Sequence, residues 1–215
     1  MINLFSKILN WIYPKKCLTC KKFIEHDFLC DECLKKINYN SPKPIKIVLD
    51  IKVYSACLYI RPINNLIKAL KYKGKTKTTK LIAQILYEYL QKTELNLENT
   101  ELIPVPLHKK RQKHRSFNHM ELIAKELSIL TSCPINNKLV KRIKNTKPQH
   151  ELSTEQRSEN LKNAFKVEKK NYNGKTIIIL DDIFTSGATV SEIIKELKNQ
   201  EIDNIITVVL SNPKK

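Results

Sequence analysis

Glycine is scarce in this chain of 215 residues, which contains only Gly74, Gly174 and Gly187. The scarcity excludes glycine-rich nucleotide loops, because neither G-x-G-x-x-G nor G-x-x-x-x-G-K-[ST] is present. Long hydrophobic runs are missing as well, since no stretch approaches the roughly 18 apolar residues that a membrane-spanning helix needs. The first residues also lack the basic start and the small-residue cleavage site of a secretory signal. Together these absences predict a cytoplasmic protein.

Positive charge is abundant. Lysine and arginine number 39 against 21 acidic residues, which gives a formal net charge of +18. Such an excess predicts an anionic partner, either a nucleic acid or a membrane surface, and we favour nucleic acid. The lysines are scattered along the chain, which argues against a disordered basic arm. A lysine-rich surface as a mere compositional habit of the source is the open alternative.

The stretch Ile177–Thr189 organises the fold prediction. Four consecutive aliphatic residues, Ile177–Leu180, predict a strand that is covered on both faces, as in a parallel sheet. Two carboxylates, Asp181 and Asp182, are expected where that strand ends. A helix should follow, because apolar residues recur at i, i+3, i+4 and i+7 over Val190–Leu197. The sequence therefore predicts an α/β protein.

The turn between this strand and this helix is expected to bind an anion. Backbone N–H groups point outward at a helix start, and the helix dipole adds positive potential there. The carboxylates of Asp181 and Asp182 cannot bind a phosphate, so they need sugar hydroxyls or a divalent cation as partners. An ordinary strand–turn–helix in another α/β protein is the alternative interpretation. The residues of the turn are Thr185, Ser186, Gly187, Ala188 and Thr189.

This order of residues resembles the ribose-phosphate fingerprint of type I phosphoribosyltransferases. The resemblance implies a parallel sheet flanked by helices. It also implies that Asp181 and Asp182 hold the ribose hydroxyls of phosphoribosyl pyrophosphate, usually with Mg²⁺. The turn of residues 185–189 would then hold the 5-phosphate of the same ligand.

Four cysteines near the start of the chain form the pattern C-x2-C-x9-C-x2-C. Paired CxxC knuckles let four thiolates meet on one tetrahedral Zn²⁺. A disulfide pair or a redox dithiol is the alternative, but the absence of an export signal disfavours disulfides and the spacing disfavours a redox site. We expect a zinc-finger module over residues 1–44 and a transferase-like domain over residues 45–215. The zinc ligands are Cys17, Cys20, Cys30 and Cys33.

Apolar residues recur at roughly helical spacing over residues 1–13, before the first knuckle. They predict an amphipathic helix that packs on the zinc module, with weak attachment to a membrane surface as the alternative. His26, between the knuckles, is expected to be a surface residue. Cys57 and Cys133 are expected to be plain core thiols.

The densest basic cluster follows a short strand at Leu102–Pro106. We expect it to form a second cationic site at the carboxyl side of the sheet, where open α/β sheets bind ligands. Asn118 and Glu121 form a capping pair for the helix that comes next. The cluster includes His108, Lys109, Lys110, Arg111, Lys113 and Arg115.

Two other polar segments are expected to face the ligand or the solvent. The turn Lys71–Lys75 is either an anion-facing turn or a solvated helix end, and the sequence favours neither. Residues 140–164 show no clear core face, which predicts a mobile lid. Candidate ligand-facing residues in this lid are Arg142, Gln149, Arg157 and Asn160. The final strand, Ile205–Leu210, is expected to close the sheet.

Several motifs spread over residues 5–210 resemble the ComF/ComFC family of competence proteins. The chain departs from the family where Ser116 replaces a glycine and Ser186 replaces the commoner threonine. The matching motifs are the four-cysteine module, Lys71–Gly74, Pro104–His108, Arg115–Asn118, Lys147–Gln149, Arg157 with Asn160–Leu161 and Ala164–Phe165, and the Asp-Asp turn.

The resemblance implies a zinc finger joined to a phosphoribosyltransferase fold that handles incoming single-stranded DNA during natural transformation. It also implies a helicase-like partner of the ComFA type at the cytoplasmic face of the inner membrane. Phe117, Tyr72 and Phe184 are candidates for stacking on bases. Two rival functions are an active phosphoribosyltransferase of nucleotide metabolism without a DNA role, and a zinc-dependent protein-docking module.

Overall fold

The computed structural model describes residues 15–24, 28–110, 112, 117–147 and 152–214. The helix expected over residues 1–13 and His26 lie outside this part of the chain. Within it, we find no helix with both the length and the apolar character that crossing a membrane requires.

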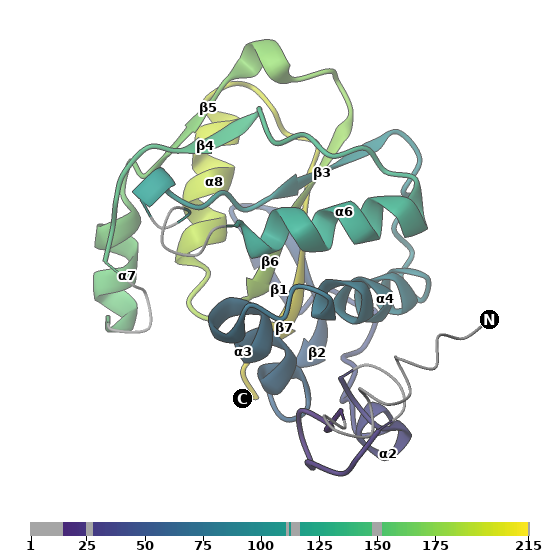
Figure 1. Cartoon of the computed structure of the whole chain (residues 1–215). Helices are drawn as coiled ribbons and strands as arrows, with labels where there is room; N and C mark the ends of the chain where they lie inside the picture. Colours follow the sequence, from purple (N-terminus) through teal and green to yellow (C-terminus); the bar gives the residue numbers. More distant parts are fainter. Residues whose placement is uncertain (1–14, 25–27, 111, 113–116, 148–151, 215) are drawn as a thin grey trace, which may run out of the picture.

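A five-stranded sheet forms the centre of the fold (Figure 1), in the order β1-β2-β7-β6-β3. All neighbouring pairs are parallel except β1 and β2, so the expectation of a mostly parallel sheet is confirmed. The expectation that the last strand closes the sheet is wrong, because β7 lies between β2 and β6. The strands are β1 (Lys46–Val48), β2 (Ile51–Leu58), β3 (Thr100–Pro104), β6 (Thr176–Ile183) and β7 (Ile205–Asn212).

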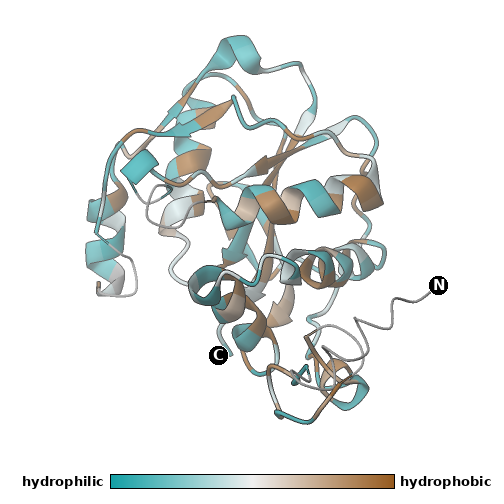
Figure 2. Ribbon diagram, in the orientation of Figure 1, coloured by the Kyte–Doolittle hydropathy of each residue, from teal (hydrophilic) through white to brown (hydrophobic). Residues whose placement is uncertain are grey.

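Helices cover both faces of this sheet. On one face lie α3 (Ile63–Lys73), α4 (Thr78–Leu90) and α6 (His119–Thr131), which share one apolar cluster with the strands. On the other face α8 (Ala188–Lys198) packs with the strands in a second cluster. Figure 2 shows the apolar residues concentrated in the central strands. The strand residues are apolar in long runs because both of their faces are buried.

The helical periods predicted from the sequence match the buried faces. In α8 the four apolar positions Val190, Ile193, Ile194 and Leu197 are at most 1% exposed. Asn118 is the N-cap of α6, because its side chain accepts a hydrogen bond from the N–H of Met120 at 3.0 Å. The predicted partner Glu121 accepts from the side-chain amide of Asn118 at 3.0 Å, so the two residues pair as predicted, but through their side chains and not through the backbone N–H bond of a capping box.

Residues 140–164 are more regular than expected. They contain β4 (Val140–Arg142) and α7 (Thr154–Leu161), and β4 pairs with β5 (Phe165–Val167) in a separate antiparallel sheet. Both β5 and α7 pack against α8. The sequence shows no apolar face because α7 is a polar helix, which begins with a capping box of Ser153 and Gln156. Residues 148–151 of the expected lid lie outside the described part.

The cysteine-rich module packs directly on the α3 and α4 side of the sheet. It contains the short helix α2 (Asp31–Leu34), and Cys17, Leu29 and Cys33 are buried in the same apolar cluster as α3 and α4. The side-chain amide of Asn65 in α3 also donates to the carbonyl of Leu18 at 3.2 Å. One continuous core therefore joins the module to the helices.

Gly187 fixes the start of α8. It is the N-cap residue with φ +79°, in the left-handed region that favours glycine. A Cβ atom there would lie 2.8 Å from Cζ of Phe184, whose ring is buried in the cluster beneath α8. Gly174 has almost the same φ, +80°, but a Cβ atom there would have no neighbour within 4 Å.

These two glycines make a matched pair for a stability measurement. Alanine at either position meets the left-handed backbone penalty of ~1–2 kcal/mol, but only Gly187→Ala also forces the Phe184 ring to move. We therefore expect Gly187→Ala to lower the melting temperature by at least about 2–4 °C more than Gly174→Ala, since ~1 kcal/mol corresponds to that shift at this chain length. Equal melting temperatures would show that the ring relaxes freely.

Candidate functional site

The register of β3 against β6 brings two loops to one edge of the sheet. Pro104 pairs with Leu180, and the N–H of Val105 donates to the carbonyl of Leu180 at 3.0 Å. The chain after β3 therefore leaves the sheet beside the acidic pair at the end of β6. This is the carboxyl edge, where parallel α/β sheets bind ligands.

Asp182 is buried and paired. It is the residue after Asp181, and both acids lie among the last three residues of β6, which agrees with the expectation that they lie where the strand ends. Its Oδ2 atom forms an ion pair with Lys71 of α3 and lies 2.8 Å from Nε2 of His119, the first residue of α6. Burial alone would raise the pKa of Asp182, but the Lys71 ammonium and the His119 imidazole hold it well below its usual range.

Asp181 has a different environment, although it is the next residue. Its Oδ1 atom accepts a hydrogen bond from the N–H of Asp182 at 2.9 Å. Burial, followed by the negative charge of Asp182, raises the pKa of Asp181 to about 7, while Lys71 and Arg142 act in the opposite direction. The two acids are thus unequal, and Asp181 changes its charge near neutral pH.

The expected anion-binding turn leads directly from the acids into α8. Thr185, Ser186 and Gly187 form the loop, and Ala188 and Thr189 begin the helix. The hydroxyl of Ser186 accepts from the N–H of Ala188 at 3.4 Å. The first N–H groups of a helix have no partner within it, so this turn has the geometry of an anion site.

One predicted stacking residue is excluded by burial. Phe184 is only 6% exposed, because its ring packs beneath Gly187, so it cannot stack on a base. Tyr72, in contrast, is 64% exposed. Phe117 is partly buried against the cluster on the α6 side.

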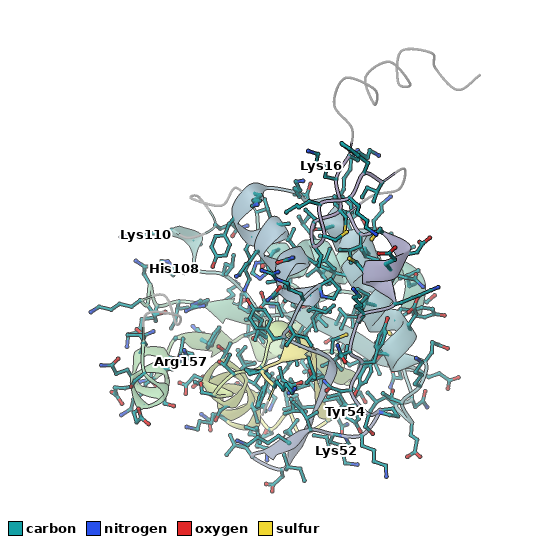
Figure 3. The ribbon with its side chains drawn as sticks, turned by 90° about the horizontal axis from the view of Figure 1, so that it is seen from below. Lys16, Lys52, Tyr54, His108, Lys110 and Arg157 are labelled. Carbon is teal, nitrogen blue, oxygen red and sulfur yellow. The ribbon has the colours of Figure 1, made fainter. Side chains whose placement is uncertain are left out.

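The structure describes part of the basic loop that follows β3. Lys109 and Lys110 are exposed, and the loop turns helically because the N–H of Gln112 donates to the carbonyl of His108 at 3.0 Å. Figure 3 shows His108 and Lys110 on the same side of the molecule as Arg157 of α7, and Lys52 on another. Arg111, Lys113 and Arg115 lie outside the described residues.

Three of the four residues predicted to line the lid lie in the described part of the chain, and each makes contacts within its own segment. Arg142 donates to Thr146 and lies over the Phe165 ring, with 5.4 Å from its Cζ to the ring centroid. Arg157 donates to the carbonyl of Leu152, and Asn160 bonds both the N–H and the carbonyl of Lys147. Gln149 lies outside the described residues. Arg142 is the member whose charge acts on Asp181.

Sequence reasoning missed the two partners of Asp182. Lys71 belongs to the segment Lys71–Lys75, for which the sequence favours neither an anion-facing turn nor a solvated helix end, and it lies in the last turn of α3. Its side chain is only 17% exposed and turns inward to the acid. Gly74, in the left-handed conformation, ends α3 just after it. His119 follows the capping residue Asn118, and this position at a helix start was the only available signal.

Only one of the two acids, Asp181 or Asp182, has a carboxylate that is available to bind a divalent cation at this site. Mg²⁺ prefers several oxygen ligands in near-octahedral geometry. Oδ2 of Asp182 is already held by an ammonium group and an imidazole, whereas the carboxylate of Asp181 accepts a backbone N–H. Asp181 is therefore the carboxylate that fits a metal-bound ligand.

The four cysteines of the N-terminal module meet in one cluster. Their Sγ atoms all lie within 4.8 Å of one another, and those of Cys20 and Cys30 are 3.6 Å apart. Tetrahedral zinc with Zn–S bonds of ~2.3 Å places its thiolates ~3.8 Å apart, so the cluster fits one Zn²⁺. Cys57 and Cys133 are buried elsewhere in the core, as expected.

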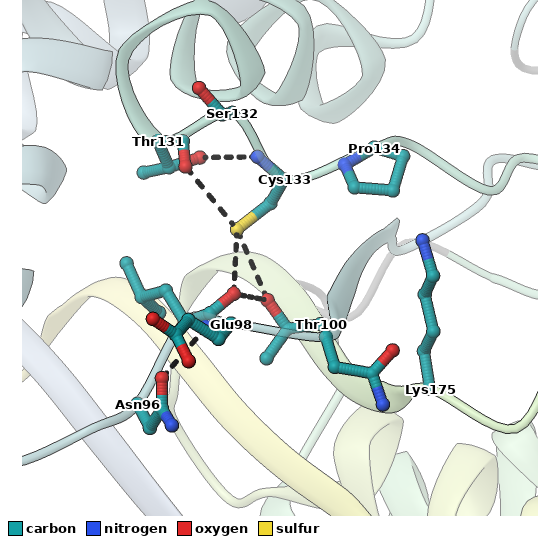
Figure 4. A pocket seen from close by; sticks show the side chains of 10 residues that line it. Asn96, Glu98, Thr100, Thr131, Ser132, Cys133, Pro134 and Lys175 are labelled. Atoms are coloured by element: carbon teal, nitrogen blue, oxygen red, sulfur yellow. Dashed lines mark hydrogen bonds between the residues drawn. The ribbon is translucent and has the colours of Figure 1, made fainter.

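A hollow of about 380 Å³ lies at the opposite edge of the sheet (Figure 4). Thr100, the first residue of β3, and Lys175, just before β6, are among its lining residues. The thiol of Cys133 and the hydroxyl of Thr100 share a hydrogen bond of 3.1 Å there. Because it lies at the amino ends of these strands, it is separate from the acidic pair.

Comparisons with known proteins agree with both halves of this description. The phosphoribosyl transferase domain family matches residues 114–215, and the double zinc ribbon domain family matches residues 8–45. The zinc ribbon match and the four-cysteine cluster together support structural zinc.

Three relatives cover different shares of the chain. Competence protein F of Haemophilus influenzae is 30% identical over 88% of this chain and 86% of its own length. DNA utilization protein YhgH of Escherichia coli K12 is 32% identical over 82% of this chain and 75% of its own length. Competence protein ComFC of Bacillus subtilis is 33% identical over 41% and 34%, respectively.

Loss of zinc should destabilise residues beyond the cysteine-rich module. We expect Cys17→Ser with Cys20→Ser to release the metal and to increase amide hydrogen exchange in α3 as well, since Cys17 is buried in the same apolar cluster as that helix. Elemental analysis and hydrogen exchange measure the two effects. Cys57→Ser is the control, because it removes a buried thiol but should retain one zinc per chain. Zinc loss without any change in α3 would contradict the shared core.

Proposed function

The chain belongs to the competence protein F family, and from this we propose that it handles single-stranded DNA during natural transformation on a domain that binds phosphoribosyl pyrophosphate. The observation that supports the proposal is the carboxyl edge of the sheet, where an acidic pair at the end of β6 is followed by a short turn and the start of α8. The proposal includes a location at the cytoplasmic face of the inner membrane beside a helicase-like partner.

The chemistry of this edge suits a phosphorylated ribose. A carboxylate accepts hydrogen bonds from sugar hydroxyls, and Asp181 is the acid whose oxygens are less occupied. The N–H groups at the start of α8 favour the 5-phosphate of the same ligand. The basic loop after β3 begins beside Leu180, which suits a pyrophosphate attached to the sugar. Mg²⁺ would accompany the pyrophosphate and contact the Asp181 side of the pair.

The proposal that the chain binds DNA rests on its net positive charge and on the names of its sequence relatives. The relatives carry the names competence protein and DNA utilization protein, and this chain has a net charge of +18. Lys109 and Lys110 are exposed, Lys110 lies on the same side of the molecule as Arg157, and exposed Tyr72 offers a ring for stacking. Lysines bind the phosphates of a single strand, and aromatic rings stack on its bases.

Binding of phosphoribosyl pyrophosphate should depend on the charge of Asp181. Its pKa of about 7 means that it is largely protonated at pH 6 and largely ionised at pH 8. The ionised fraction then rises about tenfold, so we expect the apparent affinity to rise by a similar factor. Calorimetric titration with Mg²⁺ present at both pH values measures this change.

Asp181→Asn serves as the control for the titration of the ligand's own phosphates. The variant should bind more weakly and should lose the additional pH dependence, whereas Asp181→Ala with Asp182→Ala should abolish binding. Unchanged affinity in the double variant would refute the proposed ribose site.

Binding of a single-stranded oligonucleotide should weaken with salt. Each phosphate contact on a single strand contributes about −0.7 to the slope of log K against log salt concentration. Lys109→Ala with Lys110→Ala should therefore make the slope less steep by up to about 1.4. Lys46→Ala with Lys52→Ala removes two exposed lysines of the paired strands β1 and β2, of which Lys52 lies on another side of the molecule from Lys110, and should leave the slope nearly unchanged. Salt-independent binding would contradict the proposed contacts.

A further inference from the structure

We propose that Lys71 is a built-in cation of the ribose site, which supplies part of the positive charge that Mg²⁺ would otherwise provide. This inference rests on the proposed binding of phosphoribosyl pyrophosphate, because it assigns a role within that site. Lys71 acts as a specificity-determining residue: it lets a polyanionic sugar phosphate approach two carboxylates with little help from a metal.

The position of the ammonium group carries the first step. Lys71 reaches from the last turn of α3 to Oδ2 of Asp182, and its side chain is 17% exposed while that of Asp182 is 8% exposed. A fixed positive charge thus lies at the end of β6, beside the place where sugar hydroxyls would meet the acids. A divalent cation on the same oxygen would meet like-charge repulsion from this ammonium.

The tautomer of His119 carries the second step. Nε2 lies 2.8 Å from Asp182, whereas Nδ1 is buried and has no hydrogen-bond partner among the described residues. A proton on Nδ1 would therefore lack an acceptor, which is unfavourable in the interior. The proton is on Nε2, and this N–H donates a hydrogen bond to Asp182. His119 therefore orients the carboxylate, and the positive charge beside Asp182 comes from Lys71.

The charge balance gives the consequence. With both acids ionised, Asp181, Asp182 and Lys71 sum to one negative charge, instead of the two that the acids alone would have. A ligand with a phosphate and a pyrophosphate is repelled by each uncompensated carboxylate. Removal of the ammonium group should therefore make binding depend on Mg²⁺, because the metal becomes the remaining source of compensation.

Calorimetric titration of the full chain with phosphoribosyl pyrophosphate, in Mg²⁺ and in EDTA, tests the inference. The wild-type protein should lose less than about tenfold in affinity when Mg²⁺ is removed. Lys71→Met should lose at least about a further tenfold in EDTA and recover most of it in Mg²⁺. Lys73→Met, an exposed lysine of the same helical turn, is the matched control and should behave like the wild type.

Two more variants separate the charge from folding. Lys71→Arg keeps a cation and should restore binding in EDTA. Lys71→Met with Asp182→Asn removes both members of the buried pair, so it avoids leaving an unpaired carboxylate if Lys71→Met does not fold. The site of this double variant has one negative charge, as in the wild type, so the double variant should bind phosphoribosyl pyrophosphate in EDTA more tightly than Lys71→Met does. If Lys71→Met does not fold, the double variant should still bind the ligand in EDTA.

The experiment distinguishes a failure of the role proposed for Lys71 from a failure of the proposed function. Wild-type binding that disappears in EDTA, or equal metal dependence in Lys71→Met and Lys73→Met, would overturn the role of Lys71 and leave the ribose site intact. Absence of phosphoribosyl pyrophosphate binding by the wild type in Mg²⁺ would overturn the proposed function, and this inference with it.

Discussion

A carboxylate that is buried at the end of a parallel strand has to be paired, because an isolated charge is very unfavourable in the protein interior. Asp182 of β6 is such a carboxylate, and its pairing constrains the arrangement of α3 and α6. Lys71 lies in the last turn of α3 and His119 begins α6, and both side chains meet at the same oxygen atom. The ends of these two helices are thereby tied to the carboxyl edge of the sheet, where the turn proposed to bind an anion begins.

The sequence was most informative where the signal is local. The run Ile177–Leu180, the two acids and the apolar period after Gly187 are all read within about twenty residues, and each corresponds to an observed element. Strand and helix periods differ, so a single change of period marks the turn between them. The cysteine cluster was equally accessible, since the CxxC spacing specifies how the thiolates converge.

Features that depend on distant residues could not be predicted in the same way. Lys71, His119 and Asp182 come from three elements that are far apart in the sequence, and nothing local indicates that they meet. The central place of β7 also depends on the pairing of the whole sheet. For residues 140–164 the error had another cause, because α7 is stabilised by its capping box and by packing on α8, and so needs no wide apolar face.

The inequality of the two acids connects the fold with its proposed ligands. Asp182 uses its charge to hold Lys71 and His119, which leaves Asp181 as the acid with a pKa near neutral pH and as the proposed contact for the ligand. A phosphoribosyl ligand and a DNA strand are both polyanions, and Lys71 and the loop after β3 lie at the same edge of the sheet. With both ligands bound as proposed, each would reduce the positive potential that the other meets, and by linkage each would lower the affinity for the other by the same factor. Because the ammonium of Lys71 is held by Asp182, its charge contributes to that potential whether or not a metal accompanies the sugar phosphate.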